Sequence, residues 1–203
     1  MLRISYAITA CNEHVELDRL LDQLTNNIRP EDEIVVQMDI TATDEVKAVV
    51  NKYKLMNYFH PLNNNFAAFK NNLSSLCTKE FIFQIDADEY PHPFLLASLP
   101  QILDYNYNVD VFLTPRINTV EGLTEQHIKQ WGWNVNDNGW VNFPDYQWRI
   151  WKNSSKIKWI NKVHERLDGF NEYSLLPQSE EYCLYHPKDI KRQEKQNQFY
   201  STL

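Results

Sequence analysis

Short apolar segments alternate with helical patterns along the first 110 residues, and no other feature of the sequence restricts the fold as much. Strand-like apolar runs lie at 4–8, 34–39, 56–59 and 81–85. Between them apolar residues recur at helical spacing, as in Leu17, Leu20, Leu21, Leu24 and Ile28. Strands separated by helices favour right-handed crossovers and parallel strand pairing. We therefore predict an α/β fold with a mostly parallel central sheet and helices on both of its faces.

The length and composition favour one globular domain. The chain has 203 residues, of which 43% are apolar, enough to bury a single core. We predict one domain over 1–203, divided after Asp110, where the alternation becomes irregular. Residues 1–110 carry 8 bases and 16 acids, a net charge of −8, whereas residues 111–203 carry 12 bases and 11 acids, a net charge of +1. An anionic partner should therefore favour the second half.

The sequence contains neither a candidate membrane span nor a disulfide framework. No run reaches the roughly 20 apolar residues that a membrane-crossing helix needs. The cysteines Cys11, Cys77 and Cys183 are odd in number and lack the close spacing of a zinc site or a disulfide framework. We expect a protein of the reducing cytoplasm.

The second half is predicted to be less regular than the first. A helix over 94–103 is expected to lead to a strand at 109–114. Short strands are expected at 147–151, 157–160 and 182–185, and a polar terminal helix from about Lys188 onward. The segment 131–140 mixes turn-forming residues with tryptophans. It is interpreted either as a functional loop or as a flap that its own tryptophans pack.

Polar residues follow three of the predicted strands. These clusters are 9–13, 39–44 and 86–89. Ligands of open α/β sheets collect at the carboxyl ends of the strands, so we expect the three clusters to meet at one edge of the sheet.

The strongest chemical feature is the apolar strand that ends in Asp86, Asp88 and Glu89. Three carboxylates within four residues repel one another unless a cation is near. Carboxylate oxygens suit Mg²⁺ or Mn²⁺, which keep open positions for phosphate oxygens and water. The sequence therefore predicts a metal and diphosphate site. The alternative is that the acids face solvent at the start of the following helix.

The strand ending in Asp86-Ala87-Asp88 resembles the Asp-x-Asp motif of nucleotide-sugar glycosyltransferases with the GT-A fold, particularly the inverting family 2. Four further segments are similar to motifs of that family: 4–13, with its Asn-Glu exit; 39–44, which lacks the usual glycine; 64–72, with Lys70-Asn71; and 143–151, followed by Val163-His164-Glu165. The resemblance implies a GT-A, Rossmann-like sheet with an irregular acceptor-side region at the C-terminus.

The resemblance also implies residue roles. It implies that the nucleotide sugar is bound by Thr9, Asn12, Glu13, Asp39, Lys70, Asp86 and Ala87. It places Mn²⁺ or Mg²⁺ on Asp88, with His186, or alternatively His164, completing the protein ligands. Glu165 would be the base that takes the proton of the acceptor hydroxyl. The alternative for Glu165 is a surface salt bridge with Arg166 or Lys162.

The acceptor site is predicted from aromatic and basic residues of the second half. Trp131, Trp133, Trp140 and Trp148 offer flat faces for sugar or base rings, although each could equally belong to the core. Arg149 lies in a basic stretch from Tyr146 to Arg166 in which Glu165 is the only acid. The implied donor is a UDP-sugar. The sequence leaves the acceptor open among a saccharide, a lipid-linked sugar, a protein side chain and a modified nucleic acid base, and the basic residues suggest a glycan or a hydroxymethylated base in phage-type DNA.

Two other functions are considered. A non-catalytic carbohydrate- or nucleic-acid-binding module explains the tryptophans and bases, but it does not require Asp86, Asp88 and Glu165 together. A magnesium-dependent phosphotransferase of the haloacid-dehalogenase type also has an Asp-x-Asp strand end. Two residues after the second Asp it should carry Thr or Val, whereas this chain has Tyr90.

Overall fold

The computed structural model describes residues 2–200, apart from the side chains of residues 196, 199 and 200. The elements in chain order are β1 (Ile4–Ala10), α1 (His14–Asn27), β2 (Glu33–Asp39), α2 (Asp44–Lys52), β3 (Tyr58–His60), α3 (Phe66–Leu76), β4 (Phe81–Asp86), β5 (Tyr90–Pro91), α4 (Pro93–Tyr105), β6 (Val111–Glu121), α5 (Glu125–Trp131), β7 (Val141–Lys152), β8 (Lys158–Ile160), β9 (Arg166–Asp168), β10 (Tyr173–Leu175), the 3₁₀ helix η1 (Glu180–Tyr182), β11 (Leu184–Asp189) and α6 (Ile190–Tyr200).

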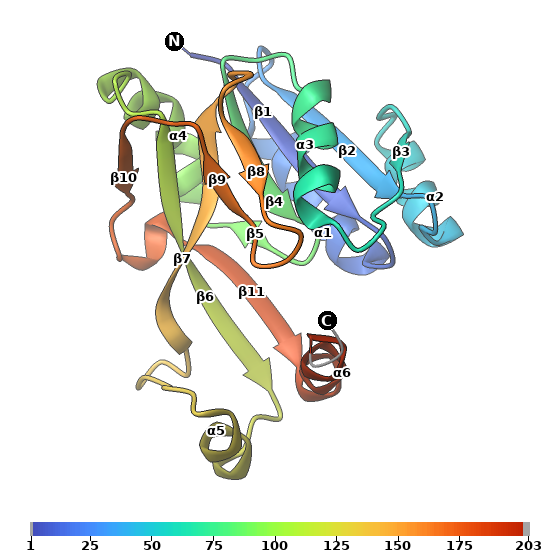
Figure 1. Cartoon of the computed structure of the whole chain (residues 1–203), viewed down its shortest axis with the longest axis vertical. Coiled ribbons are helices and arrows are strands. Elements are labelled where there is room, and N and C mark those ends of the chain that lie inside the picture. The colour runs from blue at the N-terminus through green and yellow to red at the C-terminus, as the bar shows by residue number, and fades with distance from the viewer. Residues whose placement is uncertain (1, 201–203) are drawn as a thin grey trace.

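The main sheet has the order β3-β2-β1-β4-β7-β6-β11-β5, with β10 added to β6 (Figure 1). Strands β3, β2, β1 and β4 pair in parallel, as their helical crossovers require. Strand β7 is antiparallel to both β4 and β6, and it joins the two halves of the chain in one sheet. These pairings confirm the predicted α/β fold with a mostly parallel central sheet.

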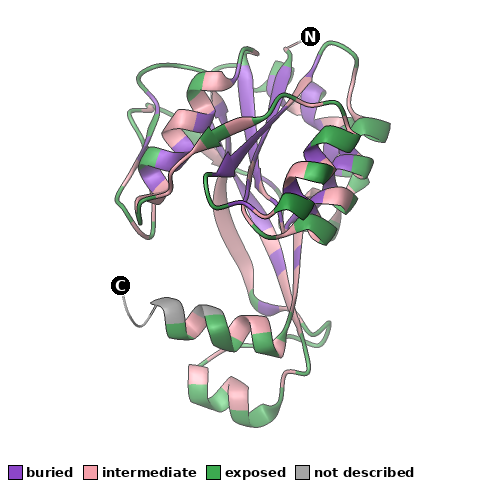
Figure 2. Ribbon diagram, turned by 90° about the vertical axis from the view of Figure 1, so that its right-hand side faces the viewer, coloured by how far each residue is buried: buried purple, intermediate pink, exposed green. Residues whose placement is uncertain are grey.

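Alternate residues of the central strands face two separate cores. On one face, Ile4, Tyr6 and Ile8 of β1 pack with helices α1, α2 and α4. On the other face, Ala7 of β1 and Ile82 of β4 pack with α3 and with the small β8–β9 sheet. The purple strands between the helix layers in Figure 2 show this burial. The helices thus cover both faces, and the strand ends are left open to form a site.

The lower part of the molecule is a small lobe built on the ends of β6, β7 and β11 (Figure 1). Helices α5 and α6 lie there, and none of their residues with described side chains is buried in Figure 2, in contrast to the strands above them. Among residues 2–200, no helix is both long and apolar enough to cross a lipid bilayer.

Several predicted boundaries in the second half are wrong. The strand expected at 109–114 runs from Val111 to Glu121, and the one expected at 147–151 runs from Val141 to Lys152. Helix α5 was not predicted, and it ends inside the segment expected to be a loop. The long strands escape pattern recognition because their lower ends carry polar residues that face the site rather than a core.

The small sheet β8–β9 holds the segment that contains Glu165. Its position over α3 is set by two hydrogen bonds: Nδ2 of Asn71 donates to the carbonyl of Trp159 and the Trp159 amide donates to Oδ1 of Asn71, both at 2.9 Å. After β9 the chain turns at Gly169, whose φ is +83°. A Cβ there would lie 2.0 Å from the carbonyl oxygen of Lys156, so only glycine allows this close approach.

Candidate active site

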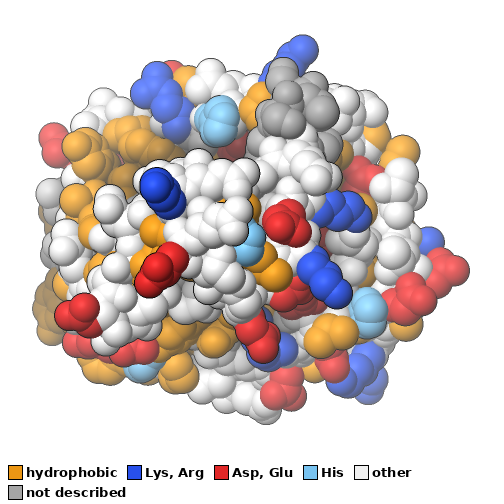
Figure 3. Space-filling model, turned by 90° about the horizontal axis from the view of Figure 1, so that it is seen from below, with side chains coloured by type: hydrophobic (Ala, Val, Ile, Leu, Met, Phe, Trp, Pro, Cys, Tyr) orange, Lys and Arg blue, Asp and Glu red, His pale blue; other side chains and the backbone are white. Residues whose placement is uncertain are grey.

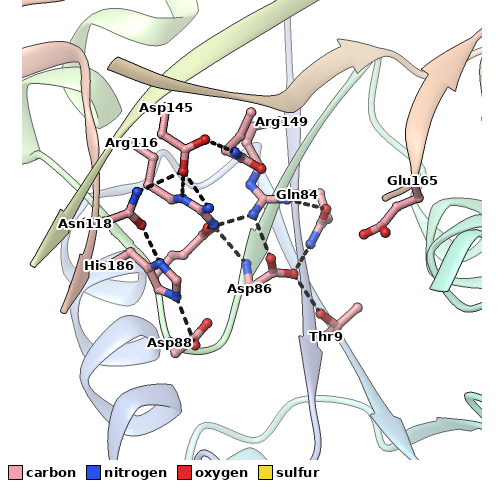
Figure 4. Close-up of polar contacts among 12 residues, drawn as sticks. Thr9, Gln84, Asp86, Asp88, Arg116, Asn118, Asp145, Arg149, Glu165 and His186 are labelled. Carbon is pink, nitrogen blue, oxygen red and sulfur yellow. Dashed lines mark hydrogen bonds and ion pairs between the residues drawn. The ribbon is translucent and has the colours of Figure 1, made fainter. Parts of the chain in front are cut away.

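The main hollow of the molecule has a volume of about 800 Å³ and lies at the carboxyl ends of β1, β2 and β4. All three polar clusters that follow these strands contribute to it, through Thr9, Asp39 and Asp86, among others. Glu165 and His186 reach it from the second half of the chain. Figure 4 shows Glu165 on the opposite side of the Asp86 carboxylate from His186.

Two of the three clustered carboxylates are neutralised by the protein itself. Arg149 donates from Nη2 to Asp86 Oδ2 and to Glu89 Oε1, both at 2.6 Å. Arg116 donates to Glu89 at 2.8 Å and to Asp145 at 2.6 Å. Glu89 is fully buried, so its charge depends on these two guanidinium groups. The predicted need for a cation near the cluster is therefore met largely by arginines.

The Asp86 carboxylate is held ionised. Burial by itself raises its pKa, but the charges of Arg149 and Lys70 and a hydrogen bond from Gln84 outweigh burial and bring the pKa far below its ordinary value. Thr9 Oγ1 donates to Asp86 Oδ1 at 3.2 Å across the paired strands β1 and β4 (Figure 4). With Arg149 on its other oxygen, Asp86 can still accept a hydrogen bond from a hydroxyl group in the hollow.

Asp88 and His186 form the pair that fits a divalent cation. Their Oδ2 and Nε2 atoms are 3.2 Å apart. The other ring nitrogen, Nδ1, lies 2.8 Å from Oδ1 of Asn118, and Asn118 donates its amide group to Asp145. This chain of contacts leaves the Asn118 oxygen as an acceptor, so Nδ1 carries the proton.

With the proton on Nδ1, the Nε2 atom of His186 and the Asp88 carboxylate form a donor set suited to Mg²⁺ or Mn²⁺. Burial lowers the pKa of His186, although the hydrogen bond to Asp88 and the Asp88 charge act in the opposite direction. In the neutral ring with the proton on Nδ1, the Nε2 lone pair faces a carboxylate oxygen, and a cation is the partner that both accept. Within residues 2–200 no group of three or more His, Cys, Asp and Glu side chains is arranged for a metal. Phosphate and water oxygens would have to complete the shell.

Arg192 of α6 also reaches Asp88. Its Nη2 lies 3.2 Å from Asp88 Oδ2, and its Nη1 donates to Glu16 of α1 at 2.7 Å. Burial raises the pKa of Asp88, but His186 and Arg192 outweigh it and lower the pKa to about 2. Asp88 is therefore ionised at any pH at which the protein works.

Glu165 and Lys70 form an ion pair inside the hollow. Lys70 Nζ donates to Glu165 Oε1 at 2.6 Å, lies 3.9 Å from Asp86 Oδ1 and sits 4.6 Å over the Trp159 ring. Arg166 and Lys162, the alternative partners predicted for Glu165, do not occupy the position that Lys70 takes beside its carboxylate. Lys70 lines the hollow in which nucleotide-sugar binding was predicted for it, and its ammonium group holds the Glu165 carboxylate.

The end of β2 is shaped by Asp39. Its Oδ1 accepts hydrogen bonds from the amide and the hydroxyl of Thr41, and its Oδ2 accepts one from the Leu62 amide at 2.7 Å. Burial raises the pKa of Asp39, but these bonds outweigh it and hold the pKa below its ordinary value. Ala87 and Glu13 also line the hollow, whereas Asn12 is exposed and lies outside its lining.

Two of the residues predicted to contact an acceptor have partners within the protein. Arg149 lines the hollow but is 2% exposed, and its charge is used by Asp86 and Glu89, so its contact with an acceptor stays a prediction. Trp148 packs against Phe170 and Tyr173, away from the hollow. Consecutive strand residues point to opposite faces, so Trp148 and Arg149 cannot share one site.

The other three tryptophans lie at or near the lower lobe. Trp133 lines the main hollow, Trp131 lines a second hollow next to it, and Trp140 packs against Phe143 at 4.8 Å. His164 lines the main hollow, and Nε2 of His186 lies 3.2 Å from Asp88 Oδ2.

Sequence reasoning missed the residues that organise the site. Arg116, Asn118 and Asp145 hold Glu89 and His186 in place, and Lys188 and Arg192 add positive charge near Asp88. Burial lowers the pKa of Lys188 to about 8. Arg116 and Asn118 are two residues apart and so lie on one face of β6. This pair of polar residues on one strand face was the sequence pattern that could have indicated their place in the site.

Cys11, at the rim of the hollow, is expected to be the first thiol to react with iodoacetamide. It is half-buried, whereas Cys77 and Cys183 are buried and have pKa values raised to about 12, mainly by burial. Burial also raises the pKa of Cys11, and Glu13 and Asp39 add to the increase. Because the thiolate is the nucleophile, the rate should increase as pH passes 9. Mass spectrometry would locate the adduct, and Cys11→Ser should remove the fast phase. Equal labelling of all three thiols in the folded protein would contradict this placement.

Comparisons with known proteins were made on the sequence and on the fold. The sequence model of the family described as "Glycosyl transferase family 2" matches residues 5–173. The search of curated proteins gives no significant match.

The chain is similar to a solved structure of glucosyl-3-phosphoglycerate synthase from Mycobacterium tuberculosis in complex with Mg²⁺ and uridine-diphosphate. The match has 15% sequence identity and a TM-score of 0.47, and it covers 64% of this chain and 46% of the synthase chain. The same enzyme with Mn²⁺, uridine-diphosphate-glucose and glycerol 3-phosphate is 16% identical, covers 60% and 46% respectively, and has a TM-score of 0.47. The chain thus spans less than half the length of these proteins. Apart from residue 4, the family match extends over all five segments in which the resemblance was found, and the chain belongs to glycosyl transferase family 2.

Proposed function

We propose that this chain transfers a sugar from a nucleoside diphosphate sugar, a UDP-sugar in the first instance, to an acceptor hydroxyl with inversion at the anomeric carbon. The observation that carries the proposal is the joint presence of the Asp88–His186 pair and Glu165 in one hollow. Membership of family 2 supports transfer of a sugar over the two other functions considered, a binding module and a phosphotransferase. The location of the protein in the cytoplasm stays a prediction.

The donor half of the proposal rests on the strand ends. Thr9, Glu13 and Asp39 would hold the nucleoside, and Asp86 would accept a hydrogen bond from a ribose hydroxyl. Asp88 and His186 would bind Mn²⁺ or Mg²⁺. When bound, such an ion supplies positive charge to the diphosphate oxygens. Lys188, at the edge of the same hollow, would add to the positive field that the departing nucleotide requires.

The chemical step assigns one role to Glu165. The acceptor hydroxyl attacks the anomeric carbon from the face opposite the diphosphate, and its proton passes to the Glu165 carboxylate. The new C–O bond forms as the bond between the anomeric carbon and the phosphate oxygen breaks, and the nucleoside diphosphate leaves with that electron pair. Lys70 holds Glu165 at 2.6 Å and so fixes the orientation of the base.

The acceptor is best described as a glycan. The basic stretch that suggested hydroxymethylated DNA loses Arg149 to internal ion pairs, and Lys152 pairs with Asp110 at 2.9 Å. Lys158, Lys162 and Arg166 remain exposed, and they are the residues that a phosphate-bearing acceptor would use. Fewer free charges than the sequence implied therefore face an acceptor.

Asp88→Ala is expected to weaken Mn²⁺-dependent UDP binding at least tenfold, because one of the two protein ligands is removed. Calorimetric titration of UDP with and without Mn²⁺ measures this effect. Nucleotide release from individual UDP-sugars, with and without Mn²⁺, measures the activity. The matched control is Asp22→Ala, on the exposed side of α1, which should behave as the unmodified chain.

Two results would contradict these assignments. If no nucleotide sugar is bound or hydrolysed by the unmodified chain, the proposed function fails. If UDP binding is the same in Asp88→Ala as in Asp22→Ala, the assignment of the cation to Asp88 is wrong.

A further inference from the structure

A second hollow, of about 600 Å³, lies between α5 and α6 in the lower lobe. Four side-chain amides line it, two from each helix: Gln126, Gln130, Asn197 and Gln198. Trp131, at the end of α5, lines it as well. Neither the predicted donor residues nor the Glu165 segment contributes to this cleft, so its composition needs an explanation of its own.

The lining of the cleft matches the chemistry of a neutral, hydroxyl-rich ligand. The Asn197 oxygen already accepts a hydrogen bond from Gln193 Nε2 at 2.9 Å. The amides of Gln126 and Gln130 each carry donors and an acceptor, a combination that suits two neighbouring hydroxyl groups of a sugar ring. The indole of Trp131 offers an apolar face for the ring's C–H groups. The ionisable members are one acid and one histidine, Glu194 and His127, whose side chains are 3.8 Å apart. No Lys or Arg lines the cleft within the described part of the chain, which disfavours a polyanion.

The aromatic residues here do not form a core. Helix α5 has no buried residue, so Trp131 and His127 are not needed to bury a hydrophobic face. His127 stacks on Trp131 at 5.0 Å with an interplanar angle of 12° and also closes the capping box with Thr124. The Trp131 ring is therefore held in place at the surface, which lowers the entropy cost of stacking a ligand on it.

The cleft is joined to the main hollow. Asn197 lines both of them. Trp133, which lines the main hollow, lies 4.7 Å from Trp131, which lines the cleft. Seen from below, this end of the molecule is largely white, with acidic and basic side chains interspersed among uncharged ones (Figure 3). A chain of sugar units can thus extend from the main hollow past Asn197 without meeting a strongly charged surface.

We propose that the cleft between α5 and α6 is an acceptor subsite for a neutral oligosaccharide, in which a sugar unit next to the reacting one lies against Trp131, Gln126 and Gln130. This inference rests on the proposed function, since it assigns the class of acceptor for the same transfer. It predicts that the enzyme prefers an acceptor of several sugar units to a monosaccharide.

The test is binding to immobilised neutral disaccharides to hexasaccharides of glucose, galactose, mannose and N-acetylglucosamine, with duplex DNA as a further ligand. The unmodified chain should bind at least one oligosaccharide, and Trp131→Ala and Gln130→Ala should each weaken that binding at least tenfold. Gln178→Ala removes an exposed amide elsewhere and is the matched control. Gln130→Ala keeps the helix intact if Trp131→Ala unfolds α5. UDP binding in the presence of Mn²⁺ is measured on each variant and should not change.

Three results would overturn the subsite: no oligosaccharide binds, binding survives both substitutions, or duplex DNA binds more tightly than every oligosaccharide. The first of these, together with normal UDP and Mn²⁺ binding, rejects the subsite but leaves the proposed function intact. If the unmodified chain does not bind UDP in the presence of Mn²⁺, the proposed function is rejected instead.

Discussion

Arg149→Met is expected to lower the free energy of unfolding by about 3–5 kcal/mol, the largest effect of any single substitution near the site. The side chain is 2% exposed and neutralises Asp86 and Glu89 at once. Methionine fills much of the same volume but leaves Glu89 buried with Arg116 as its remaining ion-pair partner. The loss therefore measures a buried charge that has lost one of its two ion-pair partners, rather than a cavity.

Urea unfolding followed by circular dichroism would measure the change. Arg166→Met removes an exposed arginine from β9 and should change the unfolding free energy by less than about 0.5 kcal/mol. Adding Glu89→Gln to Arg149→Met should recover part of the loss, because the buried charge is then removed with its partner. A loss below about 1 kcal/mol for Arg149→Met would show that the cluster does not depend on this guanidinium.

Glu165→Gln is expected to lower kcat by about 10²–10⁴-fold, the usual contribution of a general base. Glutamine keeps the size of the side chain and can still accept a hydrogen bond from Lys70, so the hollow should keep its shape. It cannot take a proton from the acceptor hydroxyl. The affinity for UDP in the presence of Mn²⁺ should stay within twofold of the unmodified chain, because Glu165 lies across the hollow from Asp88.

Initial rates at saturating donor give kcat, and calorimetry gives the UDP affinity. Glu172→Gln, an exposed acid before β10, is the control for loss of one negative charge. An unchanged kcat in Glu165→Gln would remove Glu165 from the reaction. A normal kcat with weakened UDP binding would instead make it a donor-binding residue.

The first half of the fold was predictable because its patterns are local. Leu17, Leu20, Leu21 and Leu24 are all fully buried, as their helical spacing requires. The edge at which Thr9, Asp39 and Asp86 meet follows from the same alternation, because parallel strands bring their carboxyl ends together. The second half lacks this regularity, and its long strands β6 and β7 were predicted at half their length or less.

The site was less predictable than the strand ends that bear it. The carboxylates were visible in the sequence, but their partners were not, since Arg149 lies 60 residues or more from Glu89 and Asp86 along the chain. Arg149 and Trp148 were assigned to one acceptor surface, although the two-residue period of a strand separates them. The ion pair between Lys70 and Glu165, 95 residues apart, was likewise not visible in the sequence.

By itself the sequence determined the α/β class, the edge of the sheet that carries the site and the family, because each of these depends on short-range patterns and on motifs in a fixed order. Which carboxylates are paired with Arg149 and Arg116, and which one faces His186 and Arg192, was decided only by the tertiary structure. Arg149 enters through β7, which is paired next to β4, and His186 enters through β11, on the far side of β6. Charges are paired by distance in space, and no local pattern encodes that distance.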